Sequence, residues 1–312
     1  MKKHGLILGL FSVASYSMNT PLSRGIMLEG MSPVTLLLLR FALAGFVFSS
    51  IMRFSGLAKA KEGQLAMNGR GFSLALFAGL MNGVSGVSYY YGVLQLDASM
   101  AAMIGAAVYS VTALVIGSFI NNGLTPHTFL RLGLGLLGLY FLIGPSGGEI
   151  SLIGAGLVAF ASFVYGTYLV FIQKFLGEYN TSAVSELSIW GVVIAVASFW
   201  LFFDGGEIHV STAAGWITIA VQAIIVSILG RFAMLIAIKQ MGSGEYALLS
   251  PMETLLAVLW SILFLNETLS QGQMIGASLV LGGLLISGDW FAVRFNQMFT
   301  SRRRALRRVP VA

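Results

Sequence analysis

The sequence has 312 residues, of which 57% are hydrophobic and only 10% are charged, and its mean hydropathy is +0.86. This composition excludes an ordinary soluble domain and indicates a membrane protein. The sequence has no cysteine and three histidines, which excludes a disulfide framework and argues against a metal centre. The net charge of +6 could indicate nucleic-acid binding, but most basic residues lie in loops on one side of the predicted membrane, which indicates topology instead.

Apolar stretches, separated by short turns rich in Gly, Pro, Ser and Asn, run through almost the whole chain. Each is close to the roughly 20 residues that a helix needs to cross a bilayer core. The first resembles a signal peptide, but it continues to about Met27 without a small-residue cleavage site, so we expect it to remain as a helix. We predict an all-α integral membrane fold with ten transmembrane helices, at 5–27, 32–53, 71–94, 98–120, 127–144, 151–172, 182–203, 213–238, 244–265 and 271–289.

Basic residues are distributed unevenly over the predicted loops. If the N-terminus is cytoplasmic, the inner loops hold nearly all of the Lys and Arg, whereas the outer loops hold mostly Asp and Glu, with Arg24 the one base near them. Positive charge favours the cytoplasmic side, and an even number of helices brings both termini there. We therefore predict a multi-pass protein of a bacterial-type inner membrane with both termini in the cytoplasm. The basic tail, residues 291–312, is expected to lie against anionic lipid.

The sequence contains a weak internal repeat. Gly5 and Tyr16 align with Gly154 and Tyr165, and other short segments align at a similar spacing. A unit of five helices crosses the membrane an odd number of times, so the second copy must be inverted. Inverted repeats are typical of secondary transporters, in which the substrate binds between the repeats near the middle of the membrane. We expect two such repeats around a central cavity, in residues 1–145 and residues 146–290.

Two charged residues, Arg231 and Glu253, lie deep inside predicted helices, where a charge is costly and usually functional. They stand at similar distances from the turn near Gly242, so an antiparallel pair of helices brings them to a similar depth. We expect them to approach each other directly or through water or substrate. Two interpretations remain open: a permanent ion pair, or a site whose two charges bind the carboxylate and amino groups of a zwitterion.

Polar and aromatic side chains at helical spacing mark the faces that we expect to line the cavity. Asn82, Ser85 and Tyr89 share one face of the third predicted helix. Tyr89 also lies close enough to the helix end to belong to an aromatic belt at the membrane interface. The candidate substrate-binding residues are Tyr16, Asn19, Asn82, Ser85, Tyr89, Tyr165, Arg231, Tyr246, Ser250 and Glu253.

Two other residues are expected to act in gating or structure. Pro21 is expected to kink or unwind the first helix and to free carbonyl groups there. Arg40 lies too deep to reach water easily, and we expect a structural or gating contact for it rather than a substrate contact. Gln222 lies half a turn out of phase with Arg231 on a straight α-helix, so we choose Arg231 for the cavity.

Glycines cluster in the fifth and tenth predicted helices, at Gly133, Gly135, Gly138, Gly276, Gly282 and Gly283. Small residues allow close helix contact, so these helices are expected to pack tightly, either within the chain or in a homodimer. No Walker loop, nucleophile elbow or paired-carboxylate motif is present, so we expect neither an enzyme nor an ATP-driven pump. We expect no cofactor and no nucleic-acid partner.

Two groups of residues form recognisable motifs: Ser32-Pro33 with Leu39-Arg40-Phe41, and Pro251 with Phe264-Leu265-Asn266-Glu267, Gln273, Gly276 and Gly282-Gly283. With the ten-helix pattern they resemble EamA-type members of the drug/metabolite transporter superfamily over roughly residues 5–289. The resemblance implies two inverted five-helix repeats around a central cavity that moves small metabolites. The nearest functional analogue is the YddG-type exporter of aromatic amino acids.

The chain departs from the EamA pattern at particular positions. Its first half has Ala106 and Asn122 where the second half has Pro251 and Glu267. Glu253 stands where an apolar residue is expected after the proline, which suggests ligand or ion chemistry of the chain's own.

The leading hypothesis is a secondary transporter that exports small amphipathic metabolites by alternating access. Amino acids with aromatic or large neutral side chains fit best, because the predicted cavity faces carry several tyrosines. One alternative is a proton-coupled transporter of another substrate class, in which Glu253 carries the proton. Another is a lipid-headgroup flippase, which would need an opening toward the lipid.

Overall fold

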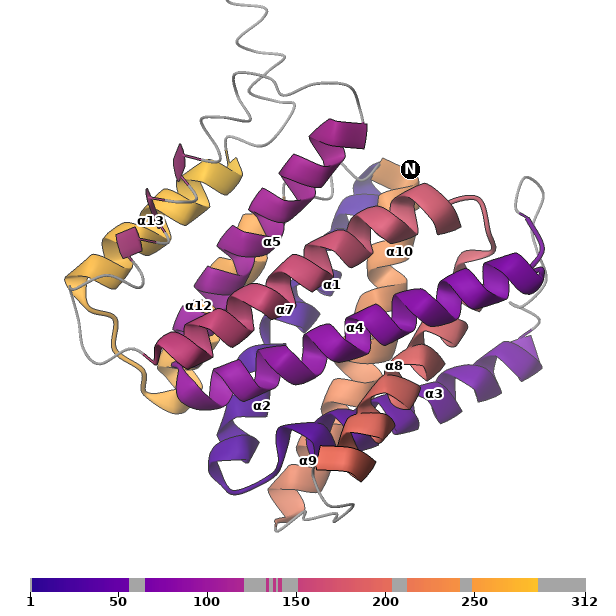
Figure 1. The fold of residues 1–312 in the computed structure, drawn as a ribbon, viewed down its shortest axis with the longest axis horizontal. Coiled ribbons are helices and arrows are strands. Elements are labelled where there is room, and N and C mark those ends of the chain that lie inside the picture. Colours follow the sequence, from indigo (N-terminus) through magenta and orange to yellow (C-terminus); the bar gives the residue numbers. More distant parts are fainter. Residues whose placement is uncertain are drawn as a thin grey trace, which may run out of the picture.

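The computed structural model is built of helices (Figure 1). It describes residues 2–55, 65–120, 133–134, 137–138, 140–141, 151–203, 212–241 and 249–285. The helices are α1 (Lys2–Ser17), α2 (Asn19–Leu28), α3 (Pro33–Ser55), α4 (Gly69–Gln95), α5 (Ala98–Ile120), α7 (Leu152–Phe171), α8 (Thr181–Phe203), α9 (Ala213–Val221), α10 (Arg231–Met241), α12 (Ser250–Leu265) and α13 (Gln271–Leu285). Two π-helical segments, η1 (Ile172–Leu176) and η2 (Gln222–Gly230), continue α7 and α9.

The helices lie on the predicted apolar stretches and begin at side chains that can accept hydrogen bonds. Asn68, Ser151 and Thr212 each precede a helix, and each accepts a bond from a backbone N–H of its first turn. The predicted fifth helix, 127–144, falls mostly outside the described residues, as does the start of the predicted ninth.

Among the described residues, five stretches are long and apolar enough to cross a membrane: Pro33–Phe54, Gly69–Gln95, Leu152–Leu176, Thr181–Phe203 and Ala213–Met234. Two shorter apolar helical stretches, Ala98–Tyr109 and Met252–Leu265, accompany them. The lengths and composition of these helices are those of a multi-pass membrane protein.

The two halves of the chain interlock. The long helix α4 of the first half packs against α7 and α8 of the second, and α10 with η2 packs against α1 and α3 of the first (Figure 1). The helix pairs α5 with α12 and α3 with α8 also join the halves. If each helix is replaced by its counterpart in the other half, the same set of helix contacts results. The most extensive helix contacts are those between the halves.

Glycines allow the closest of these helix contacts. A Cβ atom added to Gly191 on α8 would overlap the carbonyl oxygen of Leu76 and the Cα of Gly79 on α4. At the other end of α4, a Cβ on Gly154 of α7 would lie 2.8 Å from the Cβ of Gln95. The crossings of α4 with α7 and α8 are therefore as close as backbones permit.

The glycines that we selected from the sequence, where their surroundings are described, do not lie at such close helix contacts. An added Cβ would have no heavy atom within 4 Å at Gly133 or Gly282, and Gly135 lies outside the described residues. A homodimer through the fifth and tenth helices stays a prediction.

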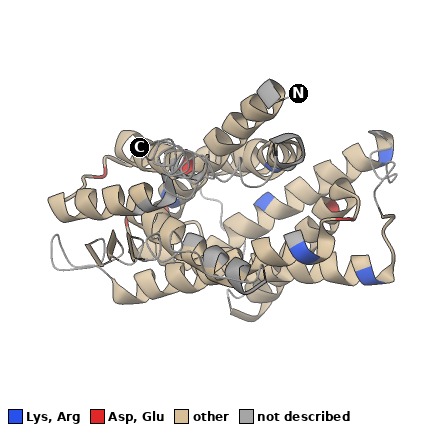
Figure 2. Cartoon of the chain, turned by 90° about the horizontal axis from the view of Figure 1, so that it is seen from above, with Lys and Arg blue, Asp and Glu red and all other residues tan. Residues whose placement is uncertain are grey.

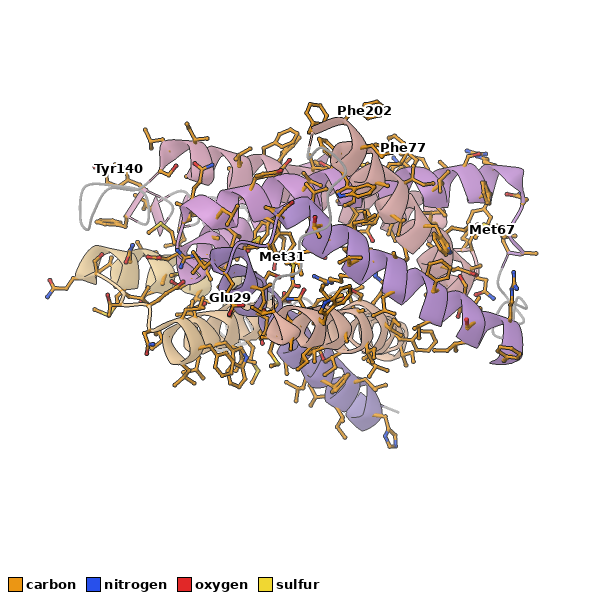
Figure 3. All side chains as sticks on the ribbon, turned by 90° about the horizontal axis from the view of Figure 1, so that it is seen from below. Glu29, Met31, Met67, Phe77, Tyr140 and Phe202 are labelled. Carbon is orange, nitrogen blue, oxygen red and sulfur yellow. The ribbon has the colours of Figure 1, made fainter. Side chains whose placement is uncertain are left out.

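The outer surface is apolar. Figure 2 shows that the described ribbon is mostly uncharged, with Lys and Arg mainly toward one end of the long axis. Figure 3 shows Phe77 and Phe202 pointing away from the ribbon, and Phe202 is 81% exposed. Large apolar side chains on the outside are suited to lipid contact rather than to water.

We expect the Gly191→Ala variant to be less stable than the natural protein by about 1–3 kcal/mol, because the new methyl group must push α4 and α8 apart. Thermal unfolding of the purified protein in detergent measures this as a lower Tm. Gly156→Ala is the matched control, since its added Cβ meets no heavy atom within 4 Å, and it should leave Tm unchanged or raise it slightly. Equal Tm values for the two variants would contradict the close crossing.

Candidate binding site

The first predicted helix is interrupted at Met18, where α1 ends and α2 begins. Pro21, in the first turn of α2, has no N–H to donate to the carbonyl group of Ser17 one turn earlier. The indole N–H of Trp260 on α12 donates to the Ser17 hydroxyl across 3.1 Å. The break expected from Pro21 is thus short, and it exposes polar groups of α1 and α2 to the helices around them.

Arg40 on α3 is 4% exposed and lies at the centre of a polar network. Its Nε donates to Ser227 Oγ at 2.8 Å, and its Nη1 lies 2.5 Å from Asn19 Oδ1 and 3.1 Å from the Tyr90 hydroxyl. Gln222 Oε1 lies 3.3 Å from the same nitrogen. These acceptors are neutral, and none of the ion pairs seen within the described residues includes Arg40. Charge-assisted bonds to neutral groups therefore hold the buried guanidinium.

The π-helix η2 explains how two residues five positions apart both reach Arg40. Gln222 and Ser227 would stand about 140° apart on an α-helix. The i→i+5 hydrogen bonds of a π-helix bring such residues onto one face. This segment is therefore not the straight α-helix that we assumed. Gln222 and Arg231 need not point to opposite sides of it. Gln222 is fully buried, and its Nε2 donates to Ser23 Oγ at 2.9 Å.

Arg231 and Glu253 lie beside a group of tyrosines. Arg231, the first residue of α10, is hydrogen-bonded to Tyr16 on α1 and interacts electrostatically with Tyr165 on α7. Glu253, in the first turn of α12, interacts electrostatically with Tyr16, Tyr89 and Tyr165. We call these five residues the tyrosine site, and they come from both halves of the chain.

Arg231 and Glu253 do not form an ion pair with each other among the pairs seen in the described residues. Both side chains are half-buried. Part of the surface of each is therefore open to a water-sized molecule. The permanent direct ion pair considered from the sequence is not present, and Tyr16 interacts with both charges instead.

Other candidates have contacts of their own. The hydroxyls of Tyr89 and Thr20 lie 3.1 Å apart, and Ser85 donates to the backbone carbonyl of Ala161 at 2.8 Å. The Ser85 hydroxyl thus joins α4 to α7, and Asn19 is bonded to Arg40 as described above. Asn82 is half-buried on α4. Tyr246 lies outside the described residues, and of Ser250 only the backbone, at the start of α12, is described.

Sequence patterns missed two aromatic neighbours of the tyrosine site. Tyr168 stacks on Tyr165 with ring centroids 5.6 Å apart, and Tyr109 on α5 meets Tyr165 edge-on at 6.1 Å. The spacing of Tyr165 and Tyr168, three residues apart on one helix, was the available signal. Tyr90, our second choice after Tyr89 for the cavity face, belongs to the Arg40 network instead.

Glu267 ties together three segments of the fold. Its carboxylate accepts from the backbone N–H of Ala98 at 2.7 Å and of Ser99 at 2.9 Å, and from the Ser99 hydroxyl at 2.6 Å. It is also 2.6 Å from Arg24 Nη1, which lies 3.1 Å from Asp97. A carboxylate from the loop between α12 and α13 thus caps the N-terminus of α5 and binds α2.

Comparison with known proteins agrees with this architecture. A family model described as "EamA-like transporter family" matches residues 3–144 and residues 152–288. A solved structure described as "Crystal structure of protein" is similar with a TM-score of 0.63 and 15% identity, over 95% of this chain and 99% of that chain. At this identity the likeness shows a shared fold alone. No curated protein matches the chain.

We expect Glu267→Ala to lower the free energy of unfolding by about 2–4 kcal/mol, because it removes a helix cap and leaves Arg24 without its closest carboxylate. Glu29→Ala is the control. Glu29 is an exposed glutamate whose one hydrogen bond, from Thr212, lies at the surface, so its loss should change stability by less than about 0.5 kcal/mol. Denaturant unfolding in detergent micelles measures both, and similar losses in the two variants would contradict the role given to Glu267.

Proposed function

Because the chain belongs to the EamA-like transporter family of drug/metabolite-type membrane transporters, we propose that it is a secondary transporter that exports amino acids with aromatic or large neutral side chains by alternating access. The family itself supports transport of small metabolites and does not select among them. The choice of substrate rests on the tyrosine site.

The separation of Arg231 from Glu253 is the observation that carries the proposal. The Arg231 guanidinium and the Glu253 carboxyl group both interact with Tyr16. Among the ion pairs of the described residues, none joins the two groups directly. An amino acid in its zwitterionic form carries the complementary pair of charges. Its carboxylate would bind Arg231 and its ammonium group would bind Glu253, so that both charges of the site are compensated while substrate is bound.

The side chain of such a substrate would lie against the tyrosines. Tyr16, Tyr89 and Tyr165 border the same site, and the stacked ring of Tyr168 extends the aromatic surface. Flat aromatic rings bury a large apolar area and prefer offset or edge contacts with other rings. This wall fits an aromatic or large neutral side chain better than a small polar one.

We further propose that the two halves are inverted repeats with both termini in the cytoplasm of a bacterial-type inner membrane. The exchange symmetry of the helix contacts supports the inverted arrangement. The turn at Leu65 pairs with the turn at Tyr179, which brings Arg70 and Lys174 to one end, whereas Glu29 and Glu267 lie near the other. This separation of charge supports the assignment of the basic end to the cytoplasm.

Counterflow into proteoliposomes tests the proposed substrate. We expect labelled L-phenylalanine to exchange in the natural protein. Arg231→Met and Glu253→Gln should each lower uptake at a limiting concentration by about 10- to 100-fold, because each removes a charge-assisted contact. Glu178→Gln, at an exposed turn residue, should leave uptake unchanged. Exchange of sugars or aliphatic acids but of no aromatic amino acid would refute the substrate class, and full activity of both site variants would refute the site.

A further inference from the structure

Glu253 lies far from the C-terminal end of α12 and has no ion-pair partner within the described residues. It precedes the end of α12 at Leu265 by about 18 Å at 1.5 Å per residue, which is more than half of a roughly 30 Å hydrocarbon core. Among the ion pairs within the described residues, none includes Glu253. Its carboxyl group is therefore deep along α12, half-buried, and without a fixed cation among the described residues.

The described side chains of the helices around α12 supply no alternative charge. The elements that pack against it are α1, α2, α5 and α13. They offer Tyr16 from α1 and Tyr109 from α5, while Arg24 of α2 is bound to Glu267 and the described part of α13 has no titratable residue. Beyond them lie the phenol groups of Tyr89, Tyr165 and Tyr168, and Arg231 is hydrogen-bonded to Tyr16. The remaining titratable side chain on α1 whose position is described, His4, is exposed near its far end.

An ionised carboxylate without a partner is costly in such a place. Two occupants remove that cost: a proton on the carboxyl oxygen, or the ammonium group of a bound molecule. Glu267 shows the contrasting arrangement, because Arg24 and two backbone N–H groups hold its carboxylate permanently. A carboxylate with permanent partners stabilises a fold, whereas a carboxylate without a fixed cation can bind either a proton or an ammonium group.

We propose that Glu253 exchanges a proton for the cationic group of the substrate, so that one proton enters for each substrate molecule that leaves. This step rests on the proposed function and adds its energy source. When substrate binds, the O–H bond of Glu253 breaks, the proton passes to the aqueous side to which the site is open, and the carboxylate pairs with the ammonium group. When substrate leaves, the carboxylate takes a proton from the side on which release occurs. Arg231, held by Tyr16, keeps its charge throughout.

Proton release on binding is the direct test. L-phenylalanine is added to the purified protein in weak buffer containing a pH indicator, and binding is followed in parallel by isothermal titration calorimetry. At a pH where Glu253 is protonated, the natural protein should release about one proton per bound molecule, and its apparent Kd should rise about 10-fold for each unit of further acidification. Glu253→Gln should bind more weakly, release no proton and show no such pH dependence, whereas Glu178→Gln should behave as the natural protein does.

Two further measurements separate failure of the exchange from failure of the substrate. Binding of L-phenylalanine without proton release at any pH would overturn the exchange and leave the proposed function intact. Absence of any binding would overturn the substrate, and infrared difference spectra of the natural protein against Glu253→Gln would then test the exchange alone. A protonated-carboxyl band that appears at acid pH and disappears at alkaline pH supports it, and a band that does not change with pH overturns it.

Discussion

The hydrogen bonds of Arg40 join parts of the chain that are distant in sequence. The guanidinium holds Asn19 at the break of the first helix, Tyr90 on α4 and Ser227 in η2. Removing any of these acceptors leaves part of a buried charge unsatisfied, which is far more costly in a membrane fold than the loss of an exposed contact. These bonds connect α2, α4 and η2 to α3 at one buried point.

The deep charges of the fold are compensated in different ways. Arg40 is bound by neutral groups, and Glu267 is bound by Arg24 and by backbone N–H groups. Arg231 is hydrogen-bonded to Tyr16, and Glu253 has no positive partner among the described residues. The first two can change little without cost to stability. The last two are half-buried and have fewer fixed partners, which is why the proposed substrate contacts are assigned to them.

The helices were predictable because a membrane helix is specified by the length and polarity of its own segment. The tyrosine site was partly predictable, since the repeat related Tyr16 to Tyr165 and depth singled out Glu253. The partners of Glu267 were not, because Ser99 and Arg24 are brought to it only by the folding of distant helices. Nor was the π-helix, since the apolar residues of η2 carry no period that distinguishes five-residue from four-residue bonding.

The π-helical winding of η2 links the direction of Arg231, which follows its last residue, to the hydrogen bond between Arg40 and Gln222, its first residue. The nine residues of η2 make about two turns as a π-helix but about two and a half turns as an α-helix, so rewinding this segment as α would rotate Arg231 by roughly half a turn relative to Gln222. Gln222 and Ser227 could then no longer both face Arg40. The hydrogen bonds of Arg40 to Gln222 and Ser227 therefore depend on the same π-helical winding that sets the direction in which Arg231 leaves the helix.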